Sequence, residues 1–314
     1  MRPAPGTELV HDPETYVRGA PLDVIDRLRE AGSGVAWVEE PPTPGSDGGP
    51  GYWLVLRHAD VKAVLRDPQT FSSWVGATQV RDPATPEDLA YVQRMMLNMD
   101  PPEHYGLRKP MQRSFTMRAV QRLEEQITGH VNDILDQALT SPGATVDFAK
   151  EVAADLPLLT LADVLGVPPQ DRLLMFDWSN RVIGFQDPDY ATSAAFDPAS
   201  GTDIGRAAFA LRPDPDPDGR MPDPRSRQGM PDLYAYAHLL AEHKQLHPGQ
   251  DVTSILLAQQ DAIAAEEFEN MFWLFVVAGN ETLRNGLPGG MHALLTHPAA
   301  QRRLRRHPEL VEPA

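Results

Sequence analysis

The chain has 314 residues, with 28 Lys and Arg against 44 Asp and Glu, which gives a formal net charge of -16. This charge excludes nucleic acid as a general partner, because phosphate binding needs a basic face. The sequence contains no cysteine, so disulfides, thiolate metal sites and cysteine nucleophiles are excluded together. The start of the chain lacks the apolar core of a signal peptide, and no apolar run is long enough to span a membrane. We therefore expect a cytoplasmic protein without a membrane span.

The N-terminal quarter of the chain predicts a helix, a strand hairpin and a second helix. Residues 22–31 have the spacing of an amphipathic helix. Two runs rich in strand-forming residues follow at 34–38 and 52–56, and the turn-rich stretch between them indicates a hairpin. Residues 58–68 return to a helical pattern. Together these elements predict a β-rich part at about 30–75.

From about residue 87 to residue 314 the pattern is helical. The stretch 117–138 carries apolar side chains at a sustained spacing of three and four, with Thr116 as the expected N-cap. Further helices are predicted at 147–166, 169–184, 232–245 and 251–260. The sequence therefore predicts a mainly α fold with a small β-rich N-terminal portion, organised as a single domain over residues 1–314.

Residues 187–232 interrupt the helical pattern. The part from 212 to 232 is dense in Pro, Asp and Gly and has too little apolar surface to order itself well. We interpret the stretch as a long mobile lid-type loop inside the helical part. A disordered insertion without a role is the alternative.

A buried-type helix, predicted from about 266 to 287, carries the sequence "AGNET" at 278–282. Helical spacing places Leu274, Ala278 and Thr282 on one face, and we expect the helix to yield beside them and Pro288 to kink or end it. A small-molecule site with proton delivery needs a gap of this kind beside a hydroxyl and a carboxylate. The alternative is structural: the glycine serves close helix packing, and the carboxylate of Glu281 only forms an ion pair with Arg284.

A second stretch, "MDPPEHYGLRK" at 99–109, predicts an anion site. Pro101, Pro102 and Glu103 are typical of a helix start, and Asp100 is the expected cap. His104 and Arg108 then lie one turn apart, and two cationic donors so placed suit a carboxylate or phosphate. A solvated surface pair is the alternative.

Together the two stretches resemble the cytochrome P-450 family of haem-thiolate monooxygenases. "MDPPEHYGLRKPMQRSFTMRAV" is similar to the segment around the family's C helix, and "AGNETLRNG" is similar to the oxygen-binding groove of its long central helix. The pieces "GYWLVLRHADVKAVLRDPQTFSS", "ADLPLLTLADVLGVPPQDR" and "DVTSILLAQ" occur in the family's order. The resemblance extends from about residue 15 to the end of the chain.

The resemblance implies a role for each candidate residue. His104 and Arg108 would hold a haem propionate, and Ala278 and Gly279 would lie over the haem face where dioxygen (O2) binds. Thr282 would steady the dioxygen and pass protons to it, and Glu281 would connect that site to solvent. The substrate pocket would be lined by Leu274 and Val277. The implied cofactors are haem b and O2.

The chain departs from the family at the axial ligand. The family binds iron through one cysteine in a Phe-x-x-Gly-x-x-x-Cys-x-Gly loop, whereas this sequence contains no cysteine and reaches its last residues at "HPELVEPA". We therefore assign no metal-ligating residue and expect an incomplete cytochrome P-450 fold that is C-terminally truncated. Thiolate donation cleaves the O–O bond, so we expect the isolated chain to be inactive and poor in haem. Apolar faces of the helices at 117–138 and 266–287 should be partly uncovered.

The resemblance implies a monooxygenase that hydroxylates a lipophilic small molecule with O2 and electrons from a ferredoxin-type partner. "AGNET" followed by "RN" resembles members that act on sterol side chains and long-chain lipids. The alternative is a non-catalytic helical remnant that binds a lipid or a protein partner. The basic group Arg302, Arg303, Arg305 and Arg306 would contact an acidic partner or form a solvated helix face.

Overall fold

The computed structural model of the chain describes residues 3–43, 48–77, 83, 85–141, 143, 145–185, 187–258 and 263–312. It contains two compact units, one of residues 1–106 with 225–227 and the other of residues 107–224 with 228–314. The structure is mainly helical with one small sheet, which confirms the predicted fold class. That the chain forms a single domain stays a prediction.

The first unit is built around a two-stranded antiparallel sheet. Strand β1 pairs with β2 so that Val35 lies opposite Val55 and Trp37 opposite Trp53, which confirms the predicted hairpin. Residues 44–47 of its turn lie outside the described residues. A small apolar core of Val24, Leu28 and Ala36 joins the sheet to α3. The elements of this unit are α1 (Thr7–His11), α2 (Pro13–Tyr16), α3 (Leu22–Glu30), β1 (Val35–Val38), β2 (Tyr52–Val55), α4 (His58–Arg66), α5 (Pro86–Val92) and η1 (Met96–Asn98).

The second unit is helical and carries the "AGNET" stretch on its longest helix, α14 (Ala265–Thr296). The other elements are η2 (Arg113–Phe115), α7 (Met117–Ala138), the π-helical turn η3 (Phe148–Ala153), α8 (Asp155–Leu165), η4 (Pro169–Asp171), α9 (Arg172–Ile183), α10 (Pro188–Ala191), α11 (Asp203–Phe209), α12 (Pro231–Leu246), α13 (Val252–Leu257), α15 (Pro298–Arg306) and η6 (Pro308–Leu310). Helix α6 (Glu103–Gln112) and turn η5 (Arg227–Gly229) cross the boundary between the units.

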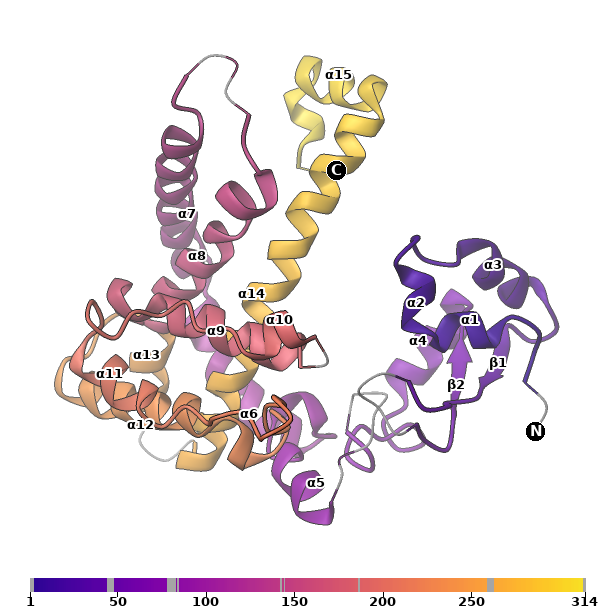
Figure 1. Cartoon of the computed structure of the whole chain (residues 1–314), viewed down its shortest axis with the longest axis horizontal. Helices are drawn as coiled ribbons and strands as arrows, with labels where there is room; N and C mark the ends of the chain where they lie inside the picture. Colours follow the sequence, from indigo (N-terminus) through magenta and orange to yellow (C-terminus); the bar gives the residue numbers. More distant parts are fainter. Residues whose placement is uncertain are drawn as a thin grey trace. The chain divides into compact units, whose positions relative to one another are not determined.

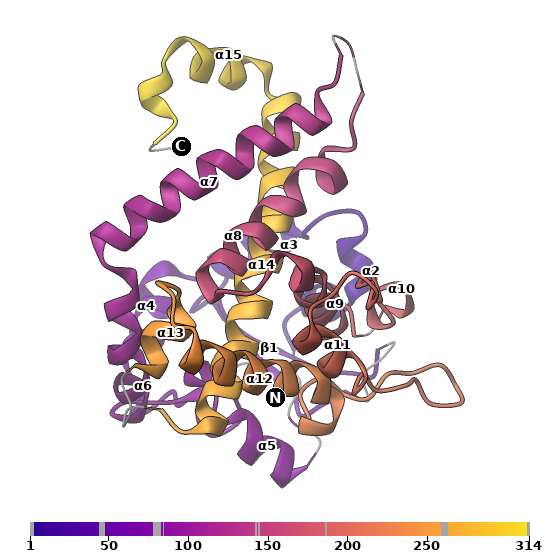
Figure 2. The ribbon, with the colours of Figure 1, turned by 90° about the vertical axis from the view of Figure 1, so that its left-hand side faces the viewer.

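Helix α14 packs against α8, α9, α12 and η3 (Figures 1 and 2). Its first half supplies Phe272, fully buried among the rings of Trp178 on α9 and Tyr236 on α12, with ring centroids 6.3 and 6.1 Å away. Buried aromatic rings contribute large apolar areas, so this cluster is the core that fixes α14. Among the described residues from Glu281 to Glu312 none is fully buried, and in Figure 1 this second half of α14 continues beyond α9 and α12 to α15.

Helix α14 corrects two expectations about backbone geometry. It remains α-helical through "AGNET", so the expected yielding of the helix there is wrong. It also continues through Pro288 to Thr296, so of the two effects expected of this proline the end of the helix is wrong, and the kink stays a prediction. Proline removes one hydrogen bond to the carbonyl four residues before it, and the helical bonds on both sides are sufficient to continue the helix.

The stretch predicted as a lid-type loop, 187–232, contains two helices, α10 and α11. The stretch is therefore not a loop throughout, and buried carboxylates of α9 and of the turn η4 before it hold part of it in place. Asp177 accepts hydrogen bonds from the amides of Ala195 and Phe196, and Asp171 accepts from the amide of Thr202. The mobility of the rest of the stretch stays a prediction.

Candidate functional site

One face of α14 presents the predicted oxygen-side residues. Ala278 and Thr282 are exposed one turn apart, and Leu274 lies half-buried on the same face one turn earlier. Val277, predicted with Leu274 to line a substrate pocket, is 6% exposed and belongs to the core of the unit. Along this face the side chains therefore change from half-buried at Leu274 to exposed at Ala278.

The hydroxyl of Thr282 is bonded to its own helix. Its Oγ1 donates to the carbonyl oxygen of Ala278 at 2.8 Å. Thr282 therefore uses the first of the two arrangements open to a mid-helix threonine, the bond to the preceding turn. The oxygen keeps its lone pairs free to accept from a ligand, and rotation about the side chain is needed before the hydroxyl can donate to one.

Gly279 lies on the packed side of α14 rather than on the open face. A Cβ atom at this position would lie 3.0 Å from Cδ1 of Leu161 on α8. The glycine therefore permits close approach of α14 and α8, as the structural alternative predicted. Its predicted place over a haem face stays a prediction.

The carboxylate of Glu281 is held by two neighbours on its own helix. Its Oε1 accepts from Nδ2 of Asn285 at 2.7 Å, and its Oε2 lies 3.8 Å from Nη1 of Arg284. The second distance is too long for a hydrogen bond but short enough for an ion pair. The predicted ion pair with Arg284 is therefore confirmed, and about four fifths of each side chain is buried.

Arg284 is held in turn by Asn180, a residue that the sequence did not single out. Nη1 of Arg284 donates to Oδ1 of Asn180 on α9 at 2.8 Å. The two residues are 104 positions apart, so no local pattern reveals the contact. Asn280, which directly precedes Glu281, is fully buried, and neither atom of its side-chain amide is hydrogen-bonded among the described residues.

The predicted anion site lies on α6. Its residues His104, half-buried, and Arg108, exposed, share this helix one turn apart, as the spacing predicted. The amide of His104 donates to the carbonyl of Asp100 at 3.0 Å. His104 belongs to the first unit and Arg108 to the second, which also contains α14.

The side chain of Asp100 does not cap α6, so that prediction is wrong. Its carboxylate accepts from the amide of Ser73 at 3.0 Å and from the hydroxyl of Ser72. The hydrogen bond from Ser72 is the main cause that lowers the pKa of Asp100 below its ordinary value. The carboxylate therefore holds the segment that follows α4 rather than the helix that follows it in the sequence.

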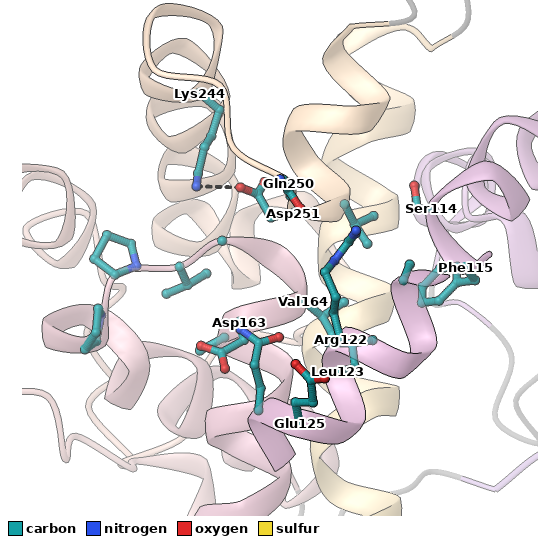
Figure 3. Close-up of a pocket in the computed structure, with 18 residues that line it drawn as sticks. Ser114, Phe115, Arg122, Leu123, Glu125, Asp163, Val164, Lys244, Gln250 and Asp251 are labelled. Carbon is teal, nitrogen blue, oxygen red and sulfur yellow. Dashed lines mark hydrogen bonds and ion pairs between the residues drawn. The ribbon is translucent and has the colours of Figure 1, made fainter. Parts of the chain in front are cut away.

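A pocket of about 660 Å³ lies elsewhere in the second unit (Figure 3). It is bordered by the first turns of α7, the end of α8 and the connection from α12 to α13, where Lys244 and Asp251 form an ion pair of 2.8 Å. A smaller pocket of about 290 Å³ adjoins Asp163, which binds His130 at 2.8 Å. The residues that line the two pockets include none of the predicted site residues.

The described residues include no cluster of three or more side chains placed to hold a metal ion. Within the same part of the chain, no helix is both long and apolar enough to cross a membrane. The residues present fit one side of the haem that the family resemblance implies, because the face at Ala278 and Thr282 is open and Arg108 is an exposed cation. A thiolate is not among them, since the sequence contains no cysteine.

Comparison with known proteins yields relatives along most of the chain. A steroid C26-monooxygenase of Rhodococcus jostii (strain RHA1) is 33% identical over 292 residues, which cover 91% of this chain and 55% of the relative. A steroid C26-monooxygenase of Mycolicibacterium smegmatis is 35% identical over 283 residues, covering 88% and 58%. A methyl-branched lipid omega-hydroxylase of Mycobacterium bovis is 31% identical over 259 residues, covering 81% and 53%. The chain thus spans between half and two thirds of the length of these relatives, and no family model matches it.

Among solved structures, a Mycobacterium marinum cytochrome P450 in complex with pseudoionone superposes with a TM-score of 0.74 at 26% sequence identity. The match covers 99% of this chain and 69% of that one. A second similar structure, P450BioI in complex with an acyl carrier protein that carries hexadec-9Z-enoic acid, has a TM-score of 0.67 at 23% identity and supports the fold.

Proposed function

The chain belongs to the cytochrome P450 family, and from this premise we propose that its residues form the oxygen and substrate side of a monooxygenase that hydroxylates a lipophilic small molecule. The observation that carries the proposal is the face of α14, where an open surface at Ala278 and Thr282 follows apolar Leu274 and adjoins the carboxylate of Glu281. The relatives named for steroid and methyl-branched lipid oxidation favour a sterol or long-chain lipid as substrate.

Each residue of this face has a distinct task in the proposal. Ala278 leaves room for a small molecule against the helix. Thr282 offers hydroxyl lone pairs to a ligand and, after rotation away from the Ala278 carbonyl, a proton. Glu281, whose side chain is 20% exposed, supplies the carboxylate that connects this face to solvent. Leu274 presents apolar surface to a lipophilic substrate, which is the usual lining of such pockets. Val277, which is 6% exposed, would contribute only the small part of its side chain that reaches the surface.

Haem b, when bound, supplies the activation of O2 that hydroxylation needs. His104 and Arg108 provide the donors suited to its propionates. The family's axial thiolate is not supplied by these 314 residues, so we propose that they do not catalyse hydroxylation by themselves. We propose further that the active protein works in the cytoplasm and takes its electrons from a ferredoxin-type partner.

Haemin titration tests the proposed cofactor site. Without the axial thiolate we expect the chain to bind haemin weakly, with a shift of the absorbance band at high haemin concentration. Arg108→Ala should weaken that binding roughly tenfold, because a charge-assisted hydrogen bond contributes about 1.5–3 kcal/mol. Arg302→Ala on α15 is the matched control, since it removes an arginine that is also exposed and lies far along the chain from α6. An unchanged band, or equal losses in both variants, would contradict the site and favour a helical protein that binds a lipid or a partner without catalysis.

A further inference from the structure

Arg284 connects the "AGNET" stretch of α14 to α9 through three contacts. Its Nη1 donates to Oδ1 of Asn180 at 2.8 Å, its guanidinium lies 4.6 Å from the ring centroid of Phe176, and it forms the ion pair with Glu281 at 3.8 Å. Only 17% of its side chain is exposed, so the guanidinium is held in one place rather than moving in solvent. A planar guanidinium suits this task because it can stack on a ring and donate along its edge at the same time.

Asn180 is itself the end of a chain of hydrogen bonds. Its side chain is almost fully buried, and its Nδ2 donates to Oγ of Ser193 at 3.0 Å. Ser193 in turn donates to Oδ1 of Asp177 at 2.8 Å, and the same carboxylate accepts the amides of Ala195 and Phe196. The position of the segment that follows α10 is thereby connected to Asn180 and, through it, to Arg284.

On the other side, Glu281 is fixed between Arg284 and Asn285. The hydrogen bond from Nδ2 of Asn285 to Oε1 of Glu281 measures 2.7 Å, and the same nitrogen donates to the backbone carbonyl of Glu281 at 3.0 Å. The environment of the Asn285 side-chain amide therefore changes when the Glu281 carboxylate moves. Loss of Arg284 removes the cationic group that forms an ion pair with that carboxylate.

We propose that Arg284 is a positioning residue, which sets the direction of the Glu281 carboxylate according to the position of Asn180 and the segment at 193–196. A displacement of that segment changes the acceptor available to Arg284, and the guanidinium carries the change to Glu281. This coupling between the segment and Glu281 needs no cofactor. Only the statement that it affects proton delivery rests on the proposed function. A merely structural role, in which Arg284 joins two helices, predicts no such transmission.

Selective labelling of asparagine with 15N provides the test, because the chain has six asparagines and their side-chain amides give few signals. We expect Asn180→Ala and Arg284→Met each to shift the side-chain amide signal of Asn285. In the Arg284→Met background, Asn180→Ala should produce no further shift, because the connection is already broken. Arg284→Lys keeps the charge and should restore the signal only in part, since an ammonium does not reproduce the planar contacts.

Asn270→Ala is the matched control, since Asn270 lies on α14 and donates to the carbonyl of Glu266 at 2.9 Å, away from this chain of contacts. It should leave the Asn285 signal in place. If Asn180→Ala does not fold, Ser193→Ala takes its place as the test, because it removes the hydrogen bond from Asn180 to Ser193 and leaves Asn180 and Arg284 unchanged. An unmoved Asn285 signal in folded Ser193→Ala or Asn180→Ala protein, or a further shift in the double variant, overturns the proposal. Haemin binding is measured separately from these signals. Failure of the proposed function can therefore be distinguished from failure of the proposed coupling.

Discussion

Single buried carboxylates on α9 fix the chain between α10 and α12, and Asp177 is the clearest case. Its oxygens accept from Ser193 Oγ at 2.8 Å and from the amides of Ala195 and Phe196 at 2.7 and 3.0 Å, and the residue is 4% exposed. Asp177→Ala leaves three donors without an acceptor, so we expect the free energy of unfolding to fall by about 3–5 kcal/mol. Urea denaturation measures this loss. The exposed Asp197, whose Oδ1 accepts the amide of Ala199, is the control and should cost less than about 1 kcal/mol when replaced by Ala.

Tyr236 makes the stability of the fold depend on pH in the alkaline range. Burial, with the negative charge of Asp171 and the hydrogen bond to it at 3.0 Å, raises the pKa of Tyr236 well above its ordinary value. Above about pH 10 the unfolded chain releases the phenolic proton while the folded chain keeps it, so the unfolded state binds fewer protons. The free energy of unfolding should therefore fall as the pH rises, by up to about 1.4 kcal/mol per pH unit from this residue.

Tyr236→Phe should be less stable at pH 8 but should lose less stability between pH 10 and 11 than the unmodified chain, as measured by urea denaturation at each pH. Tyr105, which is 62% exposed, is the matched control. Tyr105→Phe should keep the original slope. Equal slopes for all three proteins would show that Tyr236 ionises in the folded chain as readily as in the unfolded one.

At the scale of elements, α14 consists of a packed first half and an open second half, and its glycines distinguish the two. A Cβ atom at Gly279 would meet Leu161 at 3.0 Å, whereas one at Gly286 would meet no atom within 4 Å. Gly279→Ala should therefore lower the free energy of unfolding by about 1–3 kcal/mol through overpacking. Gly286→Ala should raise it or leave it unchanged, because alanine is favoured over glycine in a helix by about 1 kcal/mol and nothing obstructs it.

Thermal denaturation of the two alanine variants compares the same chemical change at two places on one helix. Opposite or clearly unequal shifts in Tm are expected. If both variants gain stability, α8 moves away from α14 to admit the methyl group, and close packing does not explain the glycine of "AGNET".

At the scale of the whole molecule, local periodicity in the sequence predicted much of the secondary structure, whereas contacts between distant residues could not be predicted from it. The 3–4 spacing at 117–138 corresponds to α7 with Thr116 as its N-cap, and the hairpin and the helical spacing of Leu274, Ala278 and Thr282 are also confirmed. The role of Asp100, the helices at 188–191 and 203–209 and the contact of Arg284 with Asn180 were missed. The role of Asp100 and the contact of Arg284 each depend on a partner many residues away, Ser72 and Asn180, which composition near the residue does not reveal. The two helices begin at local caps, Asp187 and Thr202, and this signal in the sequence was not used.

The apolar faces expected to be uncovered are present on α7 and α14, and they give the last prediction. Met117 is 76% exposed on α7, and Leu283 and Leu287, one turn apart on α14, are 56% and 38% exposed. Neighbouring exposed leucines bind hydrophobic dyes, so the double variant Leu283→Gln with Leu287→Gln should lower the fluorescence of bound 8-anilinonaphthalene-1-sulfonate. Its free energy of unfolding should change by less than about 1 kcal/mol, because surface positions contribute little. Leu246→Gln, at a leucine 77% exposed on the last residue of α12, is the control and should leave most of the fluorescence. Equal losses in the two proteins would mean that the dye reports scattered exposed leucines rather than a continuous apolar face on α14.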